Sequence, residues 1–193
     1  MEKKVVVGVA GMPGAGKATV VEVATKMGHQ VVVMGDEVRR EAQRRNLAPT
    51  PKNIGKVMFE MRKKEGPAVV AKCCIPKIKR KKGEVVVVDG LRSISEVDVF
   101  KKHFPKFILL AIHSSPETRY ERLAKRQRSD DPADLESFLE RDCRELRVGL
   151  GCVLALADTM IVNENKREDL KRDAQKFLEK VTKNERSGLT SGS

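Results

Sequence analysis

Residues 5–19 read VVVGVAGMPGAGKAT, and this stretch decides the fold. It begins with an apolar, mostly β-branched run, Val5 to Ala10, which is typical of a strand buried on both faces. A glycine-rich turn follows, and residues 17–27 then carry apolar side chains at helical spacing. Such a turn points backbone N–H groups and the positive end of a helix at an anion. The stretch therefore predicts a phosphate-binding loop of the form G-x-x-x-x-G-K, a P-loop.

Outward from this loop, apolar runs alternate with helical patterns along the chain. The expected strands are 5–10, 30–34, 84–89, 107–112 and 159–162. This alternation predicts an α/β fold, a doubly wound five-stranded parallel sheet with helices on both faces. Such sheets bind ligands at the carboxyl ends of their strands.

The domain organisation follows from the same pattern. Residues 1–181 are expected to form one domain, and residues 182–193 a disordered tail without apolar periodicity. Two or three helical patterns lie between the second and third strands, where one helix would suffice. We therefore expect a helical acceptor-binding insertion over 38–82. A charged, polar break suggests a short lid over 126–134.

Composition limits the class of partner. The chain has 193 residues and a formal net charge of +12, which favours acidic partners. Nucleotides are favoured over RNA because only 4% of residues are aromatic, which leaves few platforms for base stacking. No apolar run approaches the roughly 20 residues of a membrane span, and the four cysteines form no CxxC pair. We expect a cytoplasmic protein that binds no membrane; the sequence leaves its oligomeric state open.

The P-loop supplies most of the predicted nucleotide-binding residues. Lys17 would place a positive charge on the β- and γ-phosphates. The next position is Ala18, so the hydroxyl that usually ligates Mg²⁺ is missing there, and Thr19 lies one place later. The predicted contacts to ATP from this loop are Gly11, Met12, Pro13, Gly14, Ala15, Gly16, Lys17, Ala18 and Thr19.

Charged residues also follow the second and third strands. Asp36 and Arg39 come after the second strand, and Asp89 and Arg92 come after the third. Two arginines from separate strands could grip one acceptor phosphate through fork-like hydrogen bonds. Asp89 could organise Mg²⁺ and its waters. The alternative is structural, with Asp36 as a helix cap and Asp89 as a turn former.

Arginines surround the expected lid. Phosphoryl transfer needs positive charge around the migrating group and exclusion of water, which a closing lid supplies. We predict this role for Lys17 and for the arginines Arg122, Arg126, Arg128 and Arg141. The alternative is a solvated basic face paired with Glu121, Asp142 and Glu145. His113, after the fourth strand, is more typical of a strand-end residue than of a catalytic one.

Several of these motifs resemble known kinases. GMPGAGKAT resembles the adenylate kinase loop, GDEVR at 35–39 the segment whose arginine holds the acceptor phosphate, and DGLR at 89–92 the D-G-x-P-R motif without its proline. Residues 157–165, ADTMIVNEN, resemble the end of dephospho-coenzyme A kinases, which implies that Asn163 and Asn165 border the adenine. From Val5 to Val181 the chain resembles an archaeal family of adenylate-kinase-related P-loop proteins.

The resemblance implies ATP and Mg²⁺ as cofactors and γ-phosphoryl transfer to a phosphate-bearing, nucleotide-like acceptor, with AMP favoured. Adenylate kinases also lack a hydroxyl after the lysine and hold Mg²⁺ largely through waters, although Ala18 departs from the archaeal family's more usual serine. A dephospho-coenzyme A kinase is the first alternative, and Asp36 would then be a natural base for the attacking hydroxyl. An ATP-switched RNA or ribosome assembly factor is the second.

Overall fold

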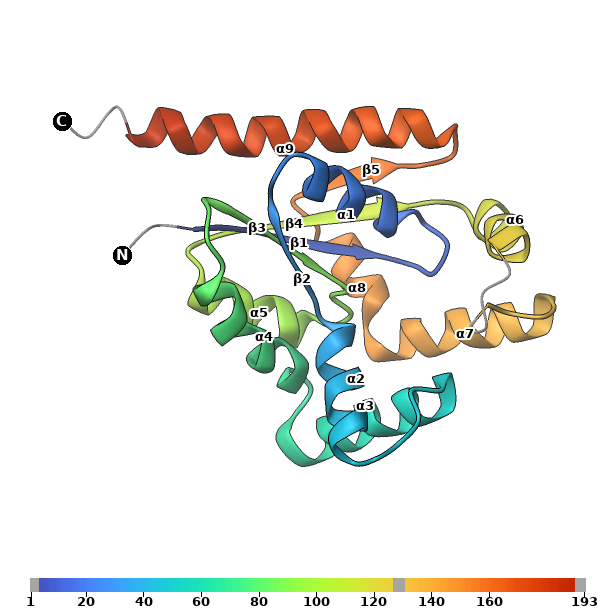
Figure 1. Cartoon of the computed structure of the whole chain (residues 1–193). Coiled ribbons are helices and arrows are strands. Elements are labelled where there is room, and N and C mark those ends of the chain that lie inside the picture. The colour runs from blue at the N-terminus through green and yellow to red at the C-terminus, as the bar shows by residue number, and fades with distance from the viewer. Residues whose placement is uncertain (1–3, 127–130, 190–193) are drawn as a thin grey trace.

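The protein is described by a computed structural model covering residues 4–126 and 131–189. Its centre is a sheet of five parallel strands in the order β2-β3-β1-β4-β5 (Figure 1). The strands are β1 (Val5–Gly11), β2 (Gln30–Val33), β3 (Val85–Asp89), β4 (Lys106–His113) and β5 (Thr159–Val162). The predicted five-stranded parallel sheet is confirmed. Because β1 is central, its carboxyl end delivers the glycine-rich turn to the middle of the sheet edge.

Helices cover both faces of the sheet, as the sequence predicts. One face packs on α1 (Lys17–Lys26) and α9 (Arg167–Leu189). The other face packs on α4 (Val69–Arg80), α5 (Ile94–His103) and α8 (Leu150–Ala155). The helices α2 (Gly35–Arg44) and α3 (Pro51–Glu65) pack on α4 and extend that core. Two more helices, α6 (Pro116–Arg126) and α7 (Leu135–Val148), lie beyond the carboxyl ends of the strands (Figure 1).

The runs of valine are explained by this double burial. In β3, Val85 and Val87 belong to the core under α1 and α9, whereas Val86 and Val88 belong to the core on the opposite face. All four are at most 2% exposed. Successive side chains of a strand point to opposite faces, so a strand covered on both sides has no polar alternation to show.

Three segments differ from the sequence-based expectations. The α4 part of the predicted insertion contacts β2 and α5 and fills the main core with Val70, Cys74 and Ile78, so α4 is the crossover helix. The part that projects from the sheet is therefore α2 and α3 alone (Figure 1). The apolar face of α4 is buried in the sheet's own core. Helical periodicity shows that a helix has an apolar face, but it does not show whether that face packs on the sheet or within an insertion.

The other two differences lie near the C-terminus. The sequence pattern does not predict helix α8, because six residues are too few to show a repeating apolar pattern. The helix begins after Gly149, whose φ of 110° ends α7. The closing helix does not stop at Val181 but continues to Leu189, so residues 182–189 of the expected disordered tail are helical. No proline interrupts that stretch. Residues 190–193 lie outside the described part of the chain.

A capping box fixes the start of α5. Its cap is Ser93: the Ser93 hydroxyl accepts from the Glu96 N–H, and the Glu96 carboxylate accepts from the Ser93 N–H. This capping box satisfies two N–H groups at once. Glu96 is 1% exposed and also accepts from the N–H of Arg92 at 2.8 Å and from Arg62 Nη2 of α3 at 2.9 Å. The loop after β3 is thereby fixed to α3.

Gly8, in the middle of β1, allows a test of this packing. A Cβ atom there would lie 2.6 Å from Phe107 Cζ, and Phe107 stacks on Phe100. We expect Gly8→Ala to lower the free energy of unfolding by about 1–3 kcal/mol in urea denaturation. Gly55 in α3 is the control, because no atom lies within 4 Å of its Cβ position. Gly55→Ala should raise stability by about 0.5–1 kcal/mol, and equal effects of the two substitutions would contradict the packing described.

Candidate functional site

The glycine-rich turn between β1 and α1 is held by close contacts on two sides. Gly14 and Gly16 have φ values of 83° and 108°, in the left-handed region that favours glycine. A Cβ atom on Gly14 would lie 2.9 Å from the carbonyl oxygen of Arg119, and one on Gly16 would lie 2.5 Å from Nδ2 of Asn163. Glycine is therefore required at both positions by conformation and by space.

Asn163 fastens the turn from the end of β5. Its Nδ2 donates to the carbonyl oxygen of Ala15 at 2.9 Å, and its side chain is buried. Arg122 Nη1 donates to the carbonyl oxygen of Asn163 and to Ser114 Oγ, each at 2.9 Å. Asn163 thus reaches the loop predicted to bind nucleotide and lines the same cavity. The structure gives it a supporting contact that the sequence did not suggest.

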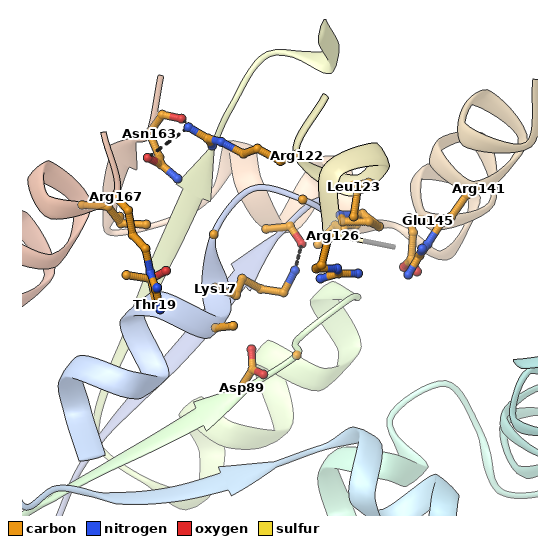
Figure 2. Close-up of a pocket in the computed structure, with 18 of the residues that line it drawn as sticks. Lys17, Thr19, Asp89, Arg122, Leu123, Arg126, Arg141, Glu145, Asn163 and Arg167 are labelled. Atoms are coloured by element: carbon orange, nitrogen blue, oxygen red, sulfur yellow. Dashed lines mark hydrogen bonds between the residues drawn. The ribbon is translucent and has the colours of Figure 1, made fainter. Parts of the chain in front are cut away.

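Lys17 turns back over the loop. Its Nζ donates to the carbonyl oxygens of Gly11 at 2.6 Å and Met12 at 3.2 Å (Figure 2). Burial lowers the pKa of Lys17 from 10.5 to about 8, and the nearby Asp89 carboxylate opposes this shift. An arriving phosphate would replace these two carbonyl contacts with a stronger charge-assisted one.

A cavity of about 620 Å³ opens in front of Lys17, at the carboxyl ends of the strands. Asp89, the last residue of β3, and Arg92, from the loop that follows, line it opposite the P-loop (Figure 2 labels Asp89). Asp89 Oδ1 is buried and has no hydrogen-bond partner within the described part of the chain. Burial raises the pKa of the Asp89 carboxyl, while the cations of Lys17 and Arg92 oppose that effect. An unsatisfied buried carboxylate oxygen is a ready ligand for a cation.

The predicted lid arginines reach the cavity in different ways. Arg122, Arg126 and Arg141 all line it, whereas Arg128 lies outside the described residues. Arg122 is already held by the β5–α9 loop, as described above. Arg126 and Arg141 share one partner, Asp131: Arg126 Nε lies 2.9 Å from Asp131 Oδ2, and Arg141 Nη1 lies 3.9 Å from Oδ1. The structure therefore brings Arg122, Arg126 and Arg141 to one cavity, but their partners differ: Arg122 binds the β5–α9 loop, and the other two pair with Asp131.

Some predicted residues do not line the cavity. The side chains of Met12 and Ala15 are buried in the core, so only the backbone of these two residues could contact a nucleotide. Asp36 and Arg39 pair with each other at 2.6 Å in the first turns of α2, with about half of each side chain exposed. Asp36 lies in the first turn of α2, after the N-cap residue Met34, so it is not the cap of that helix. Neither α2 residue is among those around the cavity.

Arg119 is the main supporting residue that sequence reasoning left out. It is 3% exposed, forms a two-pronged ion pair with Asp142 of α7, and donates to the carbonyl oxygens of Pro13 and Ser114, each at 3.2 Å. Its guanidinium also lies 5.1 Å from the centre of the Phe138 ring. The alternative of a solvated face paired with Asp142 does not hold for Arg119, whose pair with Asp142 is a buried link between the P-loop, α6 and α7.

Glu145 enters the sequence analysis only in the alternative interpretation, as a partner of arginines on a solvated face. It lines the cavity from α7, and its Oε1 lies 3.3 Å from Arg92 Nη1. Its position one helical turn after Arg141 was the available signal, since residues four apart share a helix face. Lys125 and Arg167 also line the cavity without having been singled out.

The remaining candidates carry little. His113 is exposed at the end of β4 and does not line the cavity. Among the side chains that the structure describes, no three from His, Cys, Asp or Glu gather as a metal cluster. None of the helices in residues 4–126 and 131–189 combines the length and apolar character needed to cross a bilayer.

Comparisons with known proteins agree with this architecture. Residues 10–139 match the family described as AAA domain. A UPF0200 protein of Methanocaldococcus jannaschii is 44% identical over 180 residues, covering 92% of this chain and 91% of that protein. A UPF0200 protein of Pyrococcus abyssi is 47% identical over 175 residues, covering 89% and 94%.

Solved structures show the same fold at low identity. TT1252 from Thermus thermophilus has a TM-score of 0.66 at 17% identity, covering 92% of this chain and 97% of that one. Shikimate kinase from Bacteroides thetaiotaomicron has a TM-score of 0.63 at 14% identity, covering 91% and 98%. The predicted α/β P-loop NTPase fold is confirmed.

The buried position of Lys17 predicts a pH effect on anion binding. With a pKa near 8 the free side chain loses its proton above that pH, and a bound polyphosphate restores the proton. Inorganic tripolyphosphate should therefore bind with uptake of about one proton at pH 9, and affinity should fall as pH rises above 8. Calorimetry in two buffers of different ionisation enthalpy measures the uptake. Lys17→Arg, charged throughout, should bind without it, and wild-type binding at pH 9 without uptake would refute the assignment.

Proposed function

This chain belongs to the UPF0200 family, and from that premise we propose that it is an ATP-dependent phosphotransferase. It would move the γ-phosphoryl group of ATP to a nucleotide-like small molecule, with a nucleoside monophosphate such as AMP as the favoured acceptor. A kinase-like P-loop fold is common to the chain and its structural neighbours. The reaction and the acceptor are inferred from the cavity.

One observation carries the proposal: Lys17, Arg92, Arg126 and Arg141 line a single cavity together with Asp89. The transferred phosphoryl group passes through a state whose negative charge spreads over its outer oxygens. Cations held in place around that group stabilise this state without moving during the reaction. In this arrangement Lys17 would bind the β- and γ-phosphates, and Arg126 and Arg141 would exchange Asp131 for the migrating group.

The residues fit a magnesium ion bound mainly through water and phosphate. Mg²⁺ commonly uses one or two carboxylates and keeps several waters, and the unpartnered Oδ1 of Asp89 supplies such a carboxylate oxygen. Ala18 has no hydroxyl to add as a ligand, so Asp89 is the residue that would hold the ion and its waters. When bound, the ion would neutralise charge on the β- and γ-phosphates.

The acceptor end favours a phosphate acceptor over a hydroxyl acceptor. A nucleoside monophosphate attacks with an oxygen that is already ionised and needs no base. A hydroxyl acceptor such as dephospho-coenzyme A would need one, yet Asp36 is ion-paired to Arg39 and does not line the cavity. We assign the acceptor phosphate to Arg92 first. Arg39 would add to it from α2, with α2 and α3 as the acceptor-binding part and 126–134 as the lid.

Transfer from γ-labelled ATP with Mg²⁺ tests the function. We expect label on a nucleoside monophosphate from a panel that also contains dephospho-coenzyme A, and loss of at least about 100-fold in turnover for Lys17→Ala, since the charge on the β- and γ-phosphates is gone. Lys26→Ala, an exposed lysine of the same helix, is the control. Label released only as free phosphate would refute small-molecule transfer and favour the ATP-switched RNA-binding alternative.

Arg92 and Arg39 separate the acceptor side from the ATP side. Arg92→Ala should raise the KM for the acceptor by about 10- to 100-fold while leaving ATP affinity within about twofold, because a charged hydrogen bond contributes roughly 1.5–3 kcal/mol. Arg39→Ala should act in the same direction but less strongly, given its place outside the cavity lining. Steady-state kinetics with each substrate varied measures both. A fall in ATP affinity for Arg92→Ala would contradict the assignment of Arg92 to the acceptor, because it would show that this residue contacts ATP.

A further inference from the structure

Glu145 brings a negative charge into a cavity otherwise rich in cations. It projects from α7 beside Arg141, and both side chains point toward the cavity (Figure 2). Its side chain is only 13% exposed. Arg92, Arg141 and Lys17 line the same cavity as Glu145. A buried carboxylate in a phosphate-binding cavity therefore needs a physical reason.

The two oxygens of Glu145 have different surroundings. Oε1 pairs with Arg92 Nη1 at 3.3 Å, whereas Oε2 is buried and has no hydrogen-bond partner among residues 4–126 and 131–189. Arg92 also lies 3.9 Å from Met58 Sδ of α3. Glu145 and Arg92 thus meet at the end of the cavity between α7 and α3, the end to which we assign the acceptor. A buried oxygen that accepts no hydrogen bond, such as Glu145 Oε2 within the described part of the chain, destabilises the empty site.

Acceptor binding sharpens this imbalance. If the phosphate of the bound acceptor forms hydrogen bonds with the guanidinium of Arg92, the ion pair between Arg92 and Glu145 is weakened. The Glu145 carboxylate then lies close to a second anion. The repulsion is offset only if the acceptor also presents a hydrogen-bond donor to the carboxylate. A hydroxyl or an amino group meets that need, and a site built around such a donor rejects analogues that lack it.

We propose that Glu145 determines acceptor specificity by accepting a hydrogen bond from a hydroxyl or amino group next to the phosphate that Arg92 binds. The inference rests on the proposed function, because it concerns the acceptor of that reaction. Arg92 reads the negative charge of the acceptor and Glu145 reads its donor. The acceptor class is thereby an anion that carries a hydroxyl or amino donor.

Calorimetric binding of three nucleotides to the full chain tests the inference. AMP is compared with 2′-deoxy-AMP and 3′-deoxy-AMP, each of which lacks one of the two ribose hydroxyls, the hydrogen-bond donors of AMP that lie nearest its phosphate. The triphosphate site is saturated with a non-hydrolysable ATP analogue, and EDTA excludes a divalent cation as the partner of Glu145. We expect one of the two analogues to bind about 30-fold more weakly than AMP, which identifies the donor.

Glu145→Ala should remove that preference by weakening AMP while leaving the poorer analogue unchanged or tighter, since Arg92 is released from its carboxylate. Glu140→Ala, on the exposed side of the same helix, should keep the preference. Glu145→Gln retains the volume if the alanine variant does not fold, and should also lose the preference. A purely structural role would weaken all three nucleotides equally. That result, a preference unchanged in Glu145→Ala, or no binding of any of the three would overturn the inference.

The same proteins separate this inference from the proposed function. Selective binding that depends on Glu145, without label transfer from ATP, would leave the inference standing and remove the kinase assignment. Label transfer with no dependence of acceptor choice on Glu145 would do the reverse.

Discussion

The close approach of other chain segments to two glycines of the P-loop is the constraint on which the site depends. The backbone of α6 meets Gly14, and the side chain of Asn163 meets Gly16, at distances that leave no room for a Cβ atom. These contacts join the ends of β1, β4 and β5 at one point. A loop whose N–H groups must hold a phosphate in fixed directions gains from such support, since preorganised donors need not reorient when charge arrives.

The support extends to the residues that would act on the phosphate. Arg119 links the carbonyl oxygen of Pro13 to Asp142, and so connects the loop to α6 and α7 together. Those helices carry Arg122, Arg126, Arg141 and Glu145 into the cavity. A buried arginine and carboxylate are costly to desolvate unless their geometry and hydrogen bonds are nearly complete. The pair is therefore better understood as fixing the relative position of the two helices than as a source of stability.

Charge balance in the cavity follows from the same architecture. In the proposed function, Lys17, Arg92, Arg126 and Arg141 would attract a polyphosphate. The protein pairs Arg92 with Glu145, and Arg126 and Arg141 with Asp131. Carboxylates hold the arginines in place until anions replace or share them. Asp89 differs, because its buried Oδ1 has no such partner within the described chain and so suits an ion that arrives with the nucleotide. The cavity therefore has three parts: the Arg92–Glu145 pair, the arginines held by Asp131, and the buried Oδ1 oxygen of Asp89.

The sequence by itself determined the sheet, the P-loop and the family. Valine runs, glycine spacing and the helix after Lys17 are local patterns, and each translates into one element with one place in a doubly wound sheet. It also indicated that Arg92, Asp89 and the lid arginines would converge, since strand ends meet at one edge. Only the tertiary structure decided that Arg122 is committed to the β5–α9 loop, that Arg39 stays on α2 with Asp36, and that Arg119 is buried. Those outcomes depend on which distant side chain lies within hydrogen-bond reach, and no periodicity in one segment encodes that distance. Glu145 shows the boundary well: its helix face was readable from the chain, but its pairing with an arginine 53 positions earlier arose only when α7 packed across the carboxyl edge of the sheet.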